Sequence, residues 1–220
     1  MTLRAVFFDL DGTLLDTAQD LSNALNATLL EDGLPPLPFD EARAIVSEGS
    51  FALVKQGYQL HDEDPQIPAL RQRLLDHYLR DLSANTRPFP GIESLIAQIA
   101  EAGMLWGIVT NKPWPYAEPL MQNFRFAKEP SCLLCPEHVQ HRKPDPESLF
   151  LACTQTDCHI HESIYIGDHR RDIECGKRAG MRTVAVTYGY IPVNDDPEQW
   201  GADHCVDDAS ELWPLIANYR

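Results

Sequence analysis

Two carboxylates, Asp9 and Asp11, directly follow a short apolar run near the start of the chain. The run Ala5 to Phe8 has the composition of a strand buried on both faces of a parallel sheet, and it stops at Asp9. If the backbone stays extended, both carboxylates point to the same side, into the crevice beyond the carboxyl ends of the strands. Two acids so placed repel each other, and a hard cation such as Mg²⁺, bound together with a substrate phosphate, would offset them. The spacing therefore favours a metal-assisted phosphate site.

Neighbouring polar residues could bind the anionic part of a substrate. Gly12 allows a sharp turn and leaves its N–H open to an anion, and Thr13 adds a hydroxyl donor. Farther along, the apolar run Leu105 to Val109 ends in Thr110 and Asn111. A hydroxyl at a strand end can bind a phosphoryl oxygen, so Thr110 is a candidate for substrate binding, with Asn111 beside it.

One lysine and a second pair of acids complete the set. Lys143 lies just before a proline-initiated helix, where its ammonium could counter a nucleophilic carboxylate and a phosphoryl group. Asp168 follows the apolar run Ser163 to Ile166, and Asp172 lies one helical turn later, so both acids can face the same crevice. Taken one at a time, these residues could also be a surface lysine and ordinary helix caps.

An alternation of strands and helices must position these residues. Buried strands are predicted at Ala5 to Phe8, Leu105 to Val109, Cys132 to Cys135, Ser163 to Ile166, Arg182 to Thr187 and His204 to Val206. Helical spacing separates most of them, and in the helix after Lys143 we expect Leu149, Phe150 and Ala152 to face inward. The alternation predicts an α/β fold with a Rossmann-like parallel sheet.

The segment from residue 16 to residue 87 shows helical spacing without any strand. Thr17 could cap its first helix, in which Leu21 and Leu25 recur at helical spacing. We therefore expect a core made of residues 1–15 and 88–220, interrupted by a helical insertion over residues 16–87. A helical subdomain that contributes only stability would give the same pattern.

Charge and composition exclude several classes of partner. The 220 residues include 33 Asp and Glu but only 18 Lys and Arg, giving a net charge of −15. This balance argues against nucleic acid and anionic membranes as partners, since both require a basic surface. No stretch approaches the ~18 apolar residues of a membrane span, and no signal peptide precedes Asp9, so a cytoplasmic location is expected.

Six cysteines raise the question of a metal or of disulfides. Without a secretion signal, free thiols are expected, and Cys153, Cys158, Cys175 and Cys205 are predicted to pack in the interior. The series Cys132, Cys135, His138 and His141 could bind zinc, although its spacing departs from that of zinc fingers. Stoichiometric zinc in the purified protein would support that alternative.

The segment Asp9 to Thr13 resembles the Asp-x-Asp-Gly-Thr signature of the haloacid dehalogenase-like superfamily. The resemblance implies that Asp9 attacks phosphorus to form an aspartyl-phosphate and that Asp11 protonates the leaving oxygen and later activates water. Thr110, Lys143 and the Gly-Asp-x-x-x-Asp segment with Asp168 and Asp172 resemble the second, third and fourth motifs. The resemblance implies an all-helical cap over the active site. It also implies Mg²⁺ held by Asp9, Asp168 and the Asp11 carbonyl, with Asp172 in support.

Within this superfamily, the chain looks most like the phosphoglycolate phosphatase group. Cys135 to Val139, Arg170 to Glu174 and Tyr188 to Ile191 look closer to its N-acetylmuramic acid 6-phosphate phosphatase branch, which implies a role in cell-wall recycling. Both substrates pair a phosphate ester with a carboxylate. Candidate cations for that carboxylate are Arg43, Lys55, Lys112 and Arg170.

The expected function is Mg²⁺-dependent hydrolysis of a small phosphorylated metabolite by a monomer or homodimer. Two alternatives stay open. A sugar phosphomutase would use the same motifs, and a catalytically idle binding module could share the fold. Dehalogenases lack the second acid of the first motif, so Asp11 argues against them.

Overall fold

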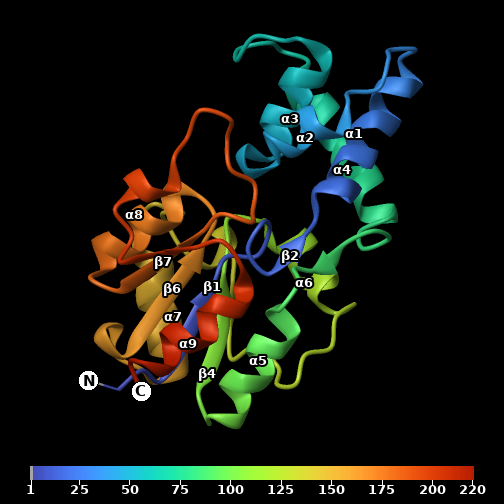
Figure 1. The fold of residues 1–220 in the computed structure, drawn as a ribbon. Coiled ribbons are helices and arrows are strands. Elements are labelled where there is room, and N and C mark those ends of the chain that lie inside the picture. Colours follow the sequence, from blue (N-terminus) through green and yellow to red (C-terminus); the bar gives the residue numbers. More distant parts are fainter. Residues whose placement is uncertain (1) are drawn as a thin grey trace. The chain divides into compact units, whose positions relative to one another are not determined.

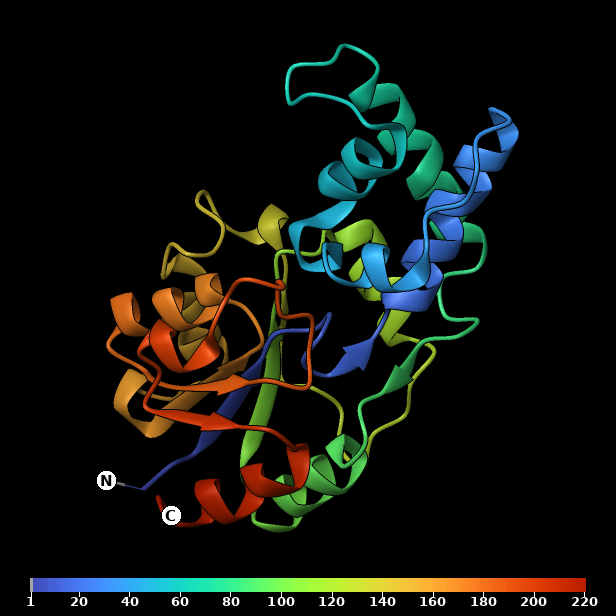
Figure 2. The ribbon, with the colours of Figure 1, turned by 45° about the horizontal axis from the view of Figure 1, so that its top comes forward.

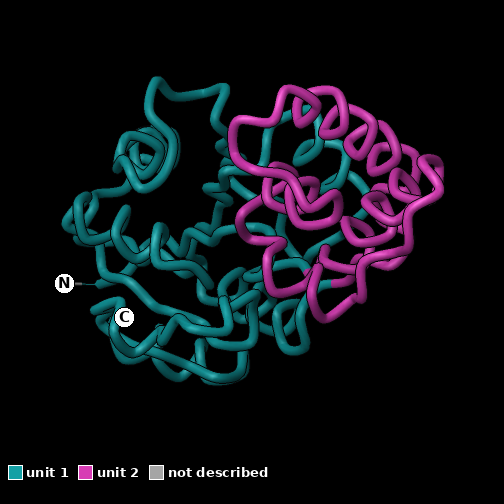
Figure 3. Tube along the Cα trace, turned by 90° about the horizontal axis from the view of Figure 1, so that it is seen from above, with its two compact units in different colours: residues 1–15, 88–220 teal, residues 16–87 magenta. Residues whose placement is uncertain are grey.

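The computed structural model describes residues 2–220, which fall into two compact units. One unit comprises the chain up to Leu15 together with Pro88–Arg220, and the other comprises Asp16–Arg87 (Figure 3). The chain passes between them through two short strands that pair with each other, β2 (Leu15–Asp16) and β3 (Arg87–Pro88). The smaller unit is thus inserted into the sequence of the larger one.

A parallel sheet forms the centre of the larger unit (Figure 1). In residues 2–220 it contains six strands in the order β5-β4-β1-β6-β7-β8, and every neighbouring pair is parallel. The strands are β1 (Ala5–Phe8), β4 (Leu105–Val109), β5 (Leu133–Leu134), β6 (Ser163–Gly167), β7 (Arg182–Val186) and β8 (His204–Val206). β1 lies inside the sheet and is fully buried, which explains its uniformly apolar sequence. The predicted α/β fold is confirmed.

Helices cover both faces of this sheet. α5 (Ile92–Glu101) packs against α9 (Leu212–Ala217), and α7 (Glu147–Thr156) packs against α8 (Arg170–Ala179). The two pairs lie on opposite faces of the sheet (Figure 2). A further helix, α6 (Trp114–Met121), follows β4, and short 3₁₀ turns occur at Pro136–His138, Ile160–Glu162, Pro197–Trp200 and Ala209–Glu211. This arrangement leaves the carboxyl ends of the strands to carry the polar residues of the sequence motifs.

The inward face predicted for α7 is only partly correct. Leu149 and Ala152 are buried, as predicted, but the Phe150 side chain is 46% exposed. Leu149, Ala152, Cys153 and Thr156 follow the spacing of one helix face and are all buried. Phe150 lies one residue beyond Leu149 and therefore points about 100° away from that face.

Two predictions about cysteines also need correction. The strand predicted from Cys132 to Cys135 is limited to Leu133–Leu134, because β5 is an edge strand that pairs only with β4. Cys205 is exposed rather than packed, because its side chain points away from the core in the edge strand β8. The other five cysteines are buried, and all six are free thiols.

The smaller unit is built from helices. They are α1 (Ala18–Glu31), α2 (Phe39–Arg43), α3 (Gly49–Tyr58) and α4 (Ile67–Arg80), with a 3₁₀ turn at Val46–Glu48. α1 packs against each of the other three helices and buries Leu21 and Leu25, as their spacing predicts. Thr17 precedes α1, but its side chain makes no capping hydrogen bond. The predicted helical region between the strands is confirmed.

A buried carboxylate joins the two ends of this unit. Asp20 of α1 accepts hydrogen bonds from the backbone N–H groups of Asn85 (3.0 Å) and Thr86 (2.8 Å). The same carboxylate accepts bonds from the Thr86 hydroxyl at 2.7 Å and the Asn85 amide at 2.8 Å. The beginning and the end of the inserted segment are therefore fastened to each other.

The helices in residues 2–220 are not suited to crossing a membrane. None of them combines the length and the apolar character that crossing a bilayer requires.

Candidate active site

Three carboxylates converge at the carboxyl edge of the sheet. Asp9 follows β1, Asp168 follows β6, and Asp172 lies in the first turn of α8. One oxygen from each of them lies within 4.8 Å of the others. β1 and β6 are neighbouring parallel strands, so their ends bring Asp9 and Asp168 together. The structure thus assembles acids that are far apart in the sequence.

Lys143 lies among these acids and is buried, as are Asp168 and Asp172, whereas Asp9 is partly exposed. Its Nζ is 3.0 Å from Asp9 Oδ1 and 2.7 Å from Asp172 Oδ1. Burial acts to lower the pKa of Lys143, but the charges and hydrogen bonds of Asp172 and Asp9 raise it above its ordinary value. The lysine therefore keeps its positive charge beside Asp9.

One ammonium does not balance three carboxylates. Burial raises the pKa of Asp168 to about 8, and the charges of Asp9 and Asp172 add to that rise. Burial also raises the pKa of Asp172, although Lys143 partly opposes the rise. Because these carboxylates have too little positive charge beside them, their oxygens are suited to binding a hard divalent cation.

Asp168 is held by two segments of the chain. Its Oδ1 accepts a hydrogen bond from the Thr13 hydroxyl (3.0 Å), and its Oδ2 accepts one from the Tyr190 N–H (2.8 Å). Gly12 has a φ of +83°, and a Cβ placed there would lie 2.1 Å from Asp168 Oδ2. A Cβ at Gly189 would lie 2.3 Å from the Asp168 Cβ. Both glycines therefore allow the backbone to approach this carboxylate closely.

Gly12 and Thr13, predicted to bind the anionic part of a substrate, make hydrogen bonds within the protein. The Gly12 N–H, expected to face an anion, donates to the Leu15 carbonyl at 3.0 Å. The Thr13 hydroxyl, expected to donate to substrate, donates to Asp168. In this structure both residues shape the surroundings of Asp168, because the turn after β1 closes on itself.

Asp11 lies outside the group of three acids and pairs with a lysine. Lys112 Nζ is 2.8 Å from Asp11 Oδ1, and the Lys112 side chain is almost fully buried. The two residues are 101 positions apart and follow the neighbouring strands β1 and β4. Asp9 and Asp11 therefore have different cationic partners, Lys143 and Lys112.

The Thr110 and Asn111 side chains lie at the end of β4. Thr110 is buried, and its hydroxyl oxygen accepts the Lys112 N–H at 3.1 Å, which leaves the hydroxyl hydrogen for donation. The Asn111 side-chain amide donates to the Lys143 carbonyl at 3.1 Å. Asn111 thus holds the lysine-bearing loop, whereas Thr110 keeps a donor suited to a phosphoryl oxygen.

The four candidate cations for a substrate carboxylate are paired with acids of the protein. The pairs are Arg43 with Asp16, Lys55 with Asp62, Lys112 with Asp11, and Arg170 with Asp195. A substrate that used any of them would have to compete with its present partner.

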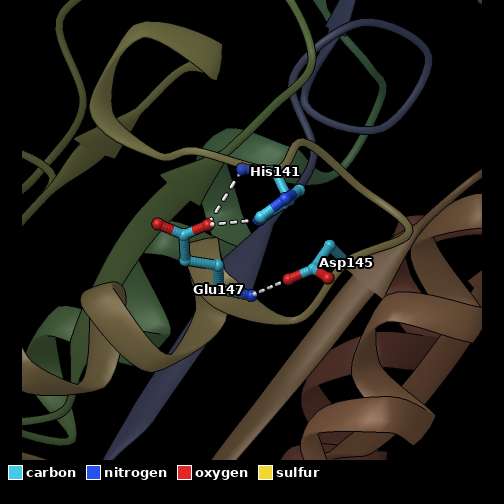
Figure 4. A group of neighbouring side chains, drawn as sticks. All are labelled: His141, Asp145 and Glu147. Carbon is cyan, nitrogen blue, oxygen red and sulfur yellow. Dashed lines mark hydrogen bonds and ion pairs between the residues drawn. The ribbon is translucent and has the colours of Figure 1, made fainter.

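The Cys and His series considered for zinc does not converge on one point. Cys132 and Cys135 are buried in the core, and His138 Nδ1 accepts the Cys135 N–H at 2.9 Å. His141 belongs instead to a second group of possible ligands, with Asp145 and Glu147 (Figure 4).

Hydrogen bonds explain this second group. The Glu147 carboxylate accepts the backbone N–H groups of Gln140 and His141, both at 2.9 Å. Asp145 Oδ1 accepts the Glu147 N–H at 3.0 Å (Figure 4). These contacts close the loop that carries Lys143, just before α7 begins.

Several residues at the site were not predicted from the sequence. The Tyr165 hydroxyl contacts Lys143, and burial raises its pKa well above the usual range, so it keeps its proton. The Tyr188 hydroxyl donates to the Thr13 carbonyl at 3.0 Å. Tyr165 has the sequence signature of any buried strand residue. Tyr188 and Tyr190 lie in the segment Tyr188 to Ile191, which resembles one branch of the phosphoglycolate phosphatase group but does not by itself indicate a role at the site.

The sequence matches one known protein family over most of its length. The family description "Haloacid dehalogenase-like hydrolase" matches residues 6–186, most of the chain. The chain belongs to the haloacid dehalogenase-like hydrolases. The family predicted from Asp9 to Thr13 and the three later motifs is therefore confirmed.

Relatives of this hydrolase include phosphatases of two kinds. An N-acetylmuramic acid 6-phosphate phosphatase of Pseudomonas aeruginosa is 46% identical over 216 residues, which cover 98% of this chain and 96% of that protein. A phosphoglycolate phosphatase of Xanthomonas campestris pv. campestris is 36% identical over 214 residues, which cover 97% and 96%. The crystal structure of a predicted phosphoglycolate phosphatase from Haemophilus somnus has a TM-score of 0.84, 22% identity and 98% coverage of both chains, and this likeness concerns the fold.

Proposed function

We propose that this hydrolase is a Mg²⁺-dependent phosphatase that acts on N-acetylmuramic acid 6-phosphate. The observation that carries the proposal is the group in which Asp9, which is partly exposed, faces the buried Lys143 beside Asp168 and Asp172. It provides a nucleophile, a fixed positive charge and a set of oxygen ligands at one edge of the sheet.

Asp9 would act as the nucleophile. Its carboxylate oxygen forms a bond to phosphorus while the bond between phosphorus and the ester oxygen breaks, which leaves an aspartyl-phosphate. Asp11 gives a proton to the departing oxygen. Asp11 then takes a proton from water, which attacks phosphorus, breaks the bond to Asp9 and releases inorganic phosphate.

Lys143 and Thr110 would hold the phosphoryl group. The Lys143 ammonium, 3.0 Å from Asp9, lies where it can offset negative charge as the phosphoryl group transfers. The Thr110 hydroxyl hydrogen would add a donor at the end of β4. Lys112 would hold the Asp11 carboxylate in place through their 2.8 Å contact.

The three carboxylates Asp9, Asp168 and Asp172 offer oxygen ligands to a divalent cation. The charges of Asp9 and Asp172 help to raise the pKa of Asp168, so a cation beside these carboxylates would offset their repulsion. Asp9 and Asp168 would hold Mg²⁺ directly, with the Asp11 carbonyl as a further ligand and Asp172 in support. Bound there, Mg²⁺ would neutralise phosphoryl charge and orient the phosphate.

The choice of substrate rests on relatedness. The P. aeruginosa N-acetylmuramic acid 6-phosphate phosphatase is more similar to this chain than the X. campestris phosphoglycolate phosphatase, at 46% against 36% identity. Residues 1–15 and 88–220 would carry catalysis, and the helical insertion 16–87 would select the substrate. With this substrate, the enzyme would serve cell-wall recycling. We expect it to act in the cytoplasm, as a monomer or homodimer.

The test is phosphate release from a panel of esters with Mg²⁺ and with EDTA. The panel contains N-acetylmuramic acid 6-phosphate, phosphoglycolate, hexose phosphates and nucleotides. A value of kcat/KM for N-acetylmuramic acid 6-phosphate at least ~10 times that for the other esters, lost in EDTA, supports the proposal. A preference for phosphoglycolate would assign the other kind of relative, and isomerisation of a hexose phosphate would indicate a mutase.

Replacing the nucleophile provides the control for this assay. We expect Asp9→Asn to lower phosphate release by at least ~10³-fold, because the amide cannot form the aspartyl-phosphate. An Asp9→Asn protein that retained turnover would remove Asp9 from the role of nucleophile. Circular dichroism checks that the variant is folded.

A further inference from the structure

A tyrosine hydroxyl outside the sequence motifs contacts the active-site lysine. Tyr165 lies in the middle of β6 and is fully buried. Its hydroxyl donates to the Val109 carbonyl at 2.7 Å and accepts from Lys143 Nζ at 2.7 Å. The nearest oxygen of Asp172 lies 3.3 Å from the hydroxyl. Tyr165 thus connects the end of β4 to the lysine.

The Lys143 ammonium faces more acceptors than it has hydrogens. Four oxygens lie within 3.0 Å of Nζ, from Asp9, Val109, Tyr165 and Asp172. An ammonium has three N–H donors and no lone pair. One of the four oxygens must therefore depend on another donor.

Two of the four oxygens have such a donor. The Val109 carbonyl is 2.7 Å from the Tyr165 hydroxyl but 3.0 Å from Lys143 Nζ. The Val109 carbonyl therefore accepts from both groups, and the shorter bond comes from Tyr165. Asp9 Oδ1 likewise has a second donor, the Leu10 N–H at 2.7 Å. Tyr165 and Asp172, both at 2.7 Å, each take one hydrogen of Lys143. Val109 and Asp9, both at 3.0 Å, therefore compete for the third.

We propose that Tyr165 is a positioning residue for the reaction: by donating to the Val109 carbonyl, its hydroxyl weakens the competition of that carbonyl with Asp9 for the third ammonium hydrogen of Lys143. The proposal rests on the function assigned above to Asp9 and Lys143. Without the hydroxyl, the Val109 carbonyl loses its shorter hydrogen bond and competes more strongly for the third ammonium hydrogen. The ammonium then moves toward Val109, away from Asp9 and from the phosphoryl group that Asp9 receives.

Removal of this one oxygen tests the proposal by kinetics. With para-nitrophenyl phosphate as a generic ester, we expect Tyr165→Phe to lower kcat by ~10-fold or more and to leave KM within ~2-fold, because the misplaced ammonium is needed most in the transition state. In a Lys143→Met background, Tyr165→Phe should cause no further loss, since the hydroxyl acts through the lysine.

A matched control separates positioning from stability. Trp106 lies in the adjacent strand β4, and its buried indole N–H donates to the Lys128 carbonyl at 2.9 Å. Trp106→Phe also removes one hydrogen bond from a buried strand, but it should keep kcat within ~2-fold. Equal losses in Trp106→Phe and Tyr165→Phe, or an equal effect of Tyr165→Phe with and without Lys143, would overturn the proposal.

A readout without turnover separates this inference from the proposed function. The side-chain ¹⁵N signal of the Lys143 ammonium, assigned by its loss in Lys143→Arg, should shift in Tyr165→Phe and stay unchanged in Trp106→Phe. An unchanged signal in Tyr165→Phe overturns the hydrogen-bond assignment even in an active enzyme. If wild-type protein releases no phosphate from any ester, the proposed function fails and the reaction role of Tyr165 fails with it, while a shifted signal would still support the hydrogen-bond assignment.

Discussion

Each of the first two acids in the chain has its own lysine. Lys143 contacts Asp9, and Lys112 contacts Asp11. A nucleophile must stay ionised, whereas an acid–base residue must change its protonation during turnover. Separate partners let the protein set the surroundings of Asp9 and Asp11 independently, although only one residue lies between them.

Gly12 offers a test of how closely the backbone must approach Asp168. We expect Gly12→Ala to lower activity by at least ~100-fold, since the new Cβ would lie 2.1 Å from Asp168 Oδ2 and displace that carboxylate. The positive φ of +83° adds a backbone strain of about 1 kcal/mol. Phosphate release and urea unfolding measure the two effects.

Gly103→Ala is the matched control. Gly103 also has a positive φ, +72°, but nothing lies within 4 Å of an added Cβ. It should lose about 1 kcal/mol of unfolding free energy and keep its activity. Similar activities for the two variants would show that the approach to Asp168 is not required.

For single residues, the sequence predicts the location of those that directly follow a buried strand. Asp9, Asp168 and Thr110 each follow an apolar run, and the structure places all of them at the carboxyl edge of the sheet. The contact between Lys112 and Asp11 was not predictable, because it spans 101 residues and neither residue type specifies its partner. Tyr165 was missed because a buried aromatic residue in a strand normally indicates packing alone.

Among the structural elements, α1 depends on one buried side chain. Asp20 accepts the backbone N–H groups of Asn85 and Thr86, so Asp20→Ala would leave these buried donors without an acceptor. We expect the free energy of unfolding to fall by about 3 kcal/mol. Urea denaturation followed by circular dichroism measures the change.

An exposed acid in the same unit provides the comparison. Asp62 pairs with Lys55 on the surface, where its side chain is 70% exposed, so Asp62→Ala should change the unfolding free energy by less than about 1 kcal/mol. If Asp20→Ala were equally mild, the fastening between the ends of the inserted segment would contribute little.

Most elements were predictable because each is long enough to show a period. α5 buries Ile92, Leu95, Ile96 and Ile99, as its spacing predicts. The wrong predictions concern the edge strands β5 and β8: Cys132 and Cys135 lie outside β5, and Cys205 in β8 is exposed. An edge strand pairs on one side only, so a short apolar sequence fixes neither its length nor the facing of each residue.

For the whole molecule, the buried acids link stability to pH and to metal. Burial raises the pKa of Asp168 from about 4 to about 8 in the metal-free protein. Between these values the folded state binds more protons than the unfolded chain, so the free energy of unfolding should decrease as pH rises from about 4 to about 8. Mg²⁺ bound by the same carboxylates should oppose this loss.

Thermal melts from pH 5 to pH 8.5, in EDTA and in Mg²⁺, measure this link. In EDTA, Tm should fall with rising pH more steeply for the wild type than for Asp168→Asn, which lacks the titrating group. In Mg²⁺, the wild-type Tm at pH 8 should be higher than in EDTA. Parallel curves for the wild type and Asp168→Asn would refute the assignment of the effect to Asp168.

The point at which the inserted segment begins and ends has an evolutionary consequence. The Phe89 N–H donates to the Leu14 carbonyl at 3.0 Å, so the larger unit is already joined across the gap in its own sequence. An insertion at such a closed junction can be lengthened, exchanged or redesigned without rerouting any strand of the sheet. With substrate choice in the inserted segment, as proposed above, descendants of one ancestral hydrolase could acquire new substrates by changing that segment alone.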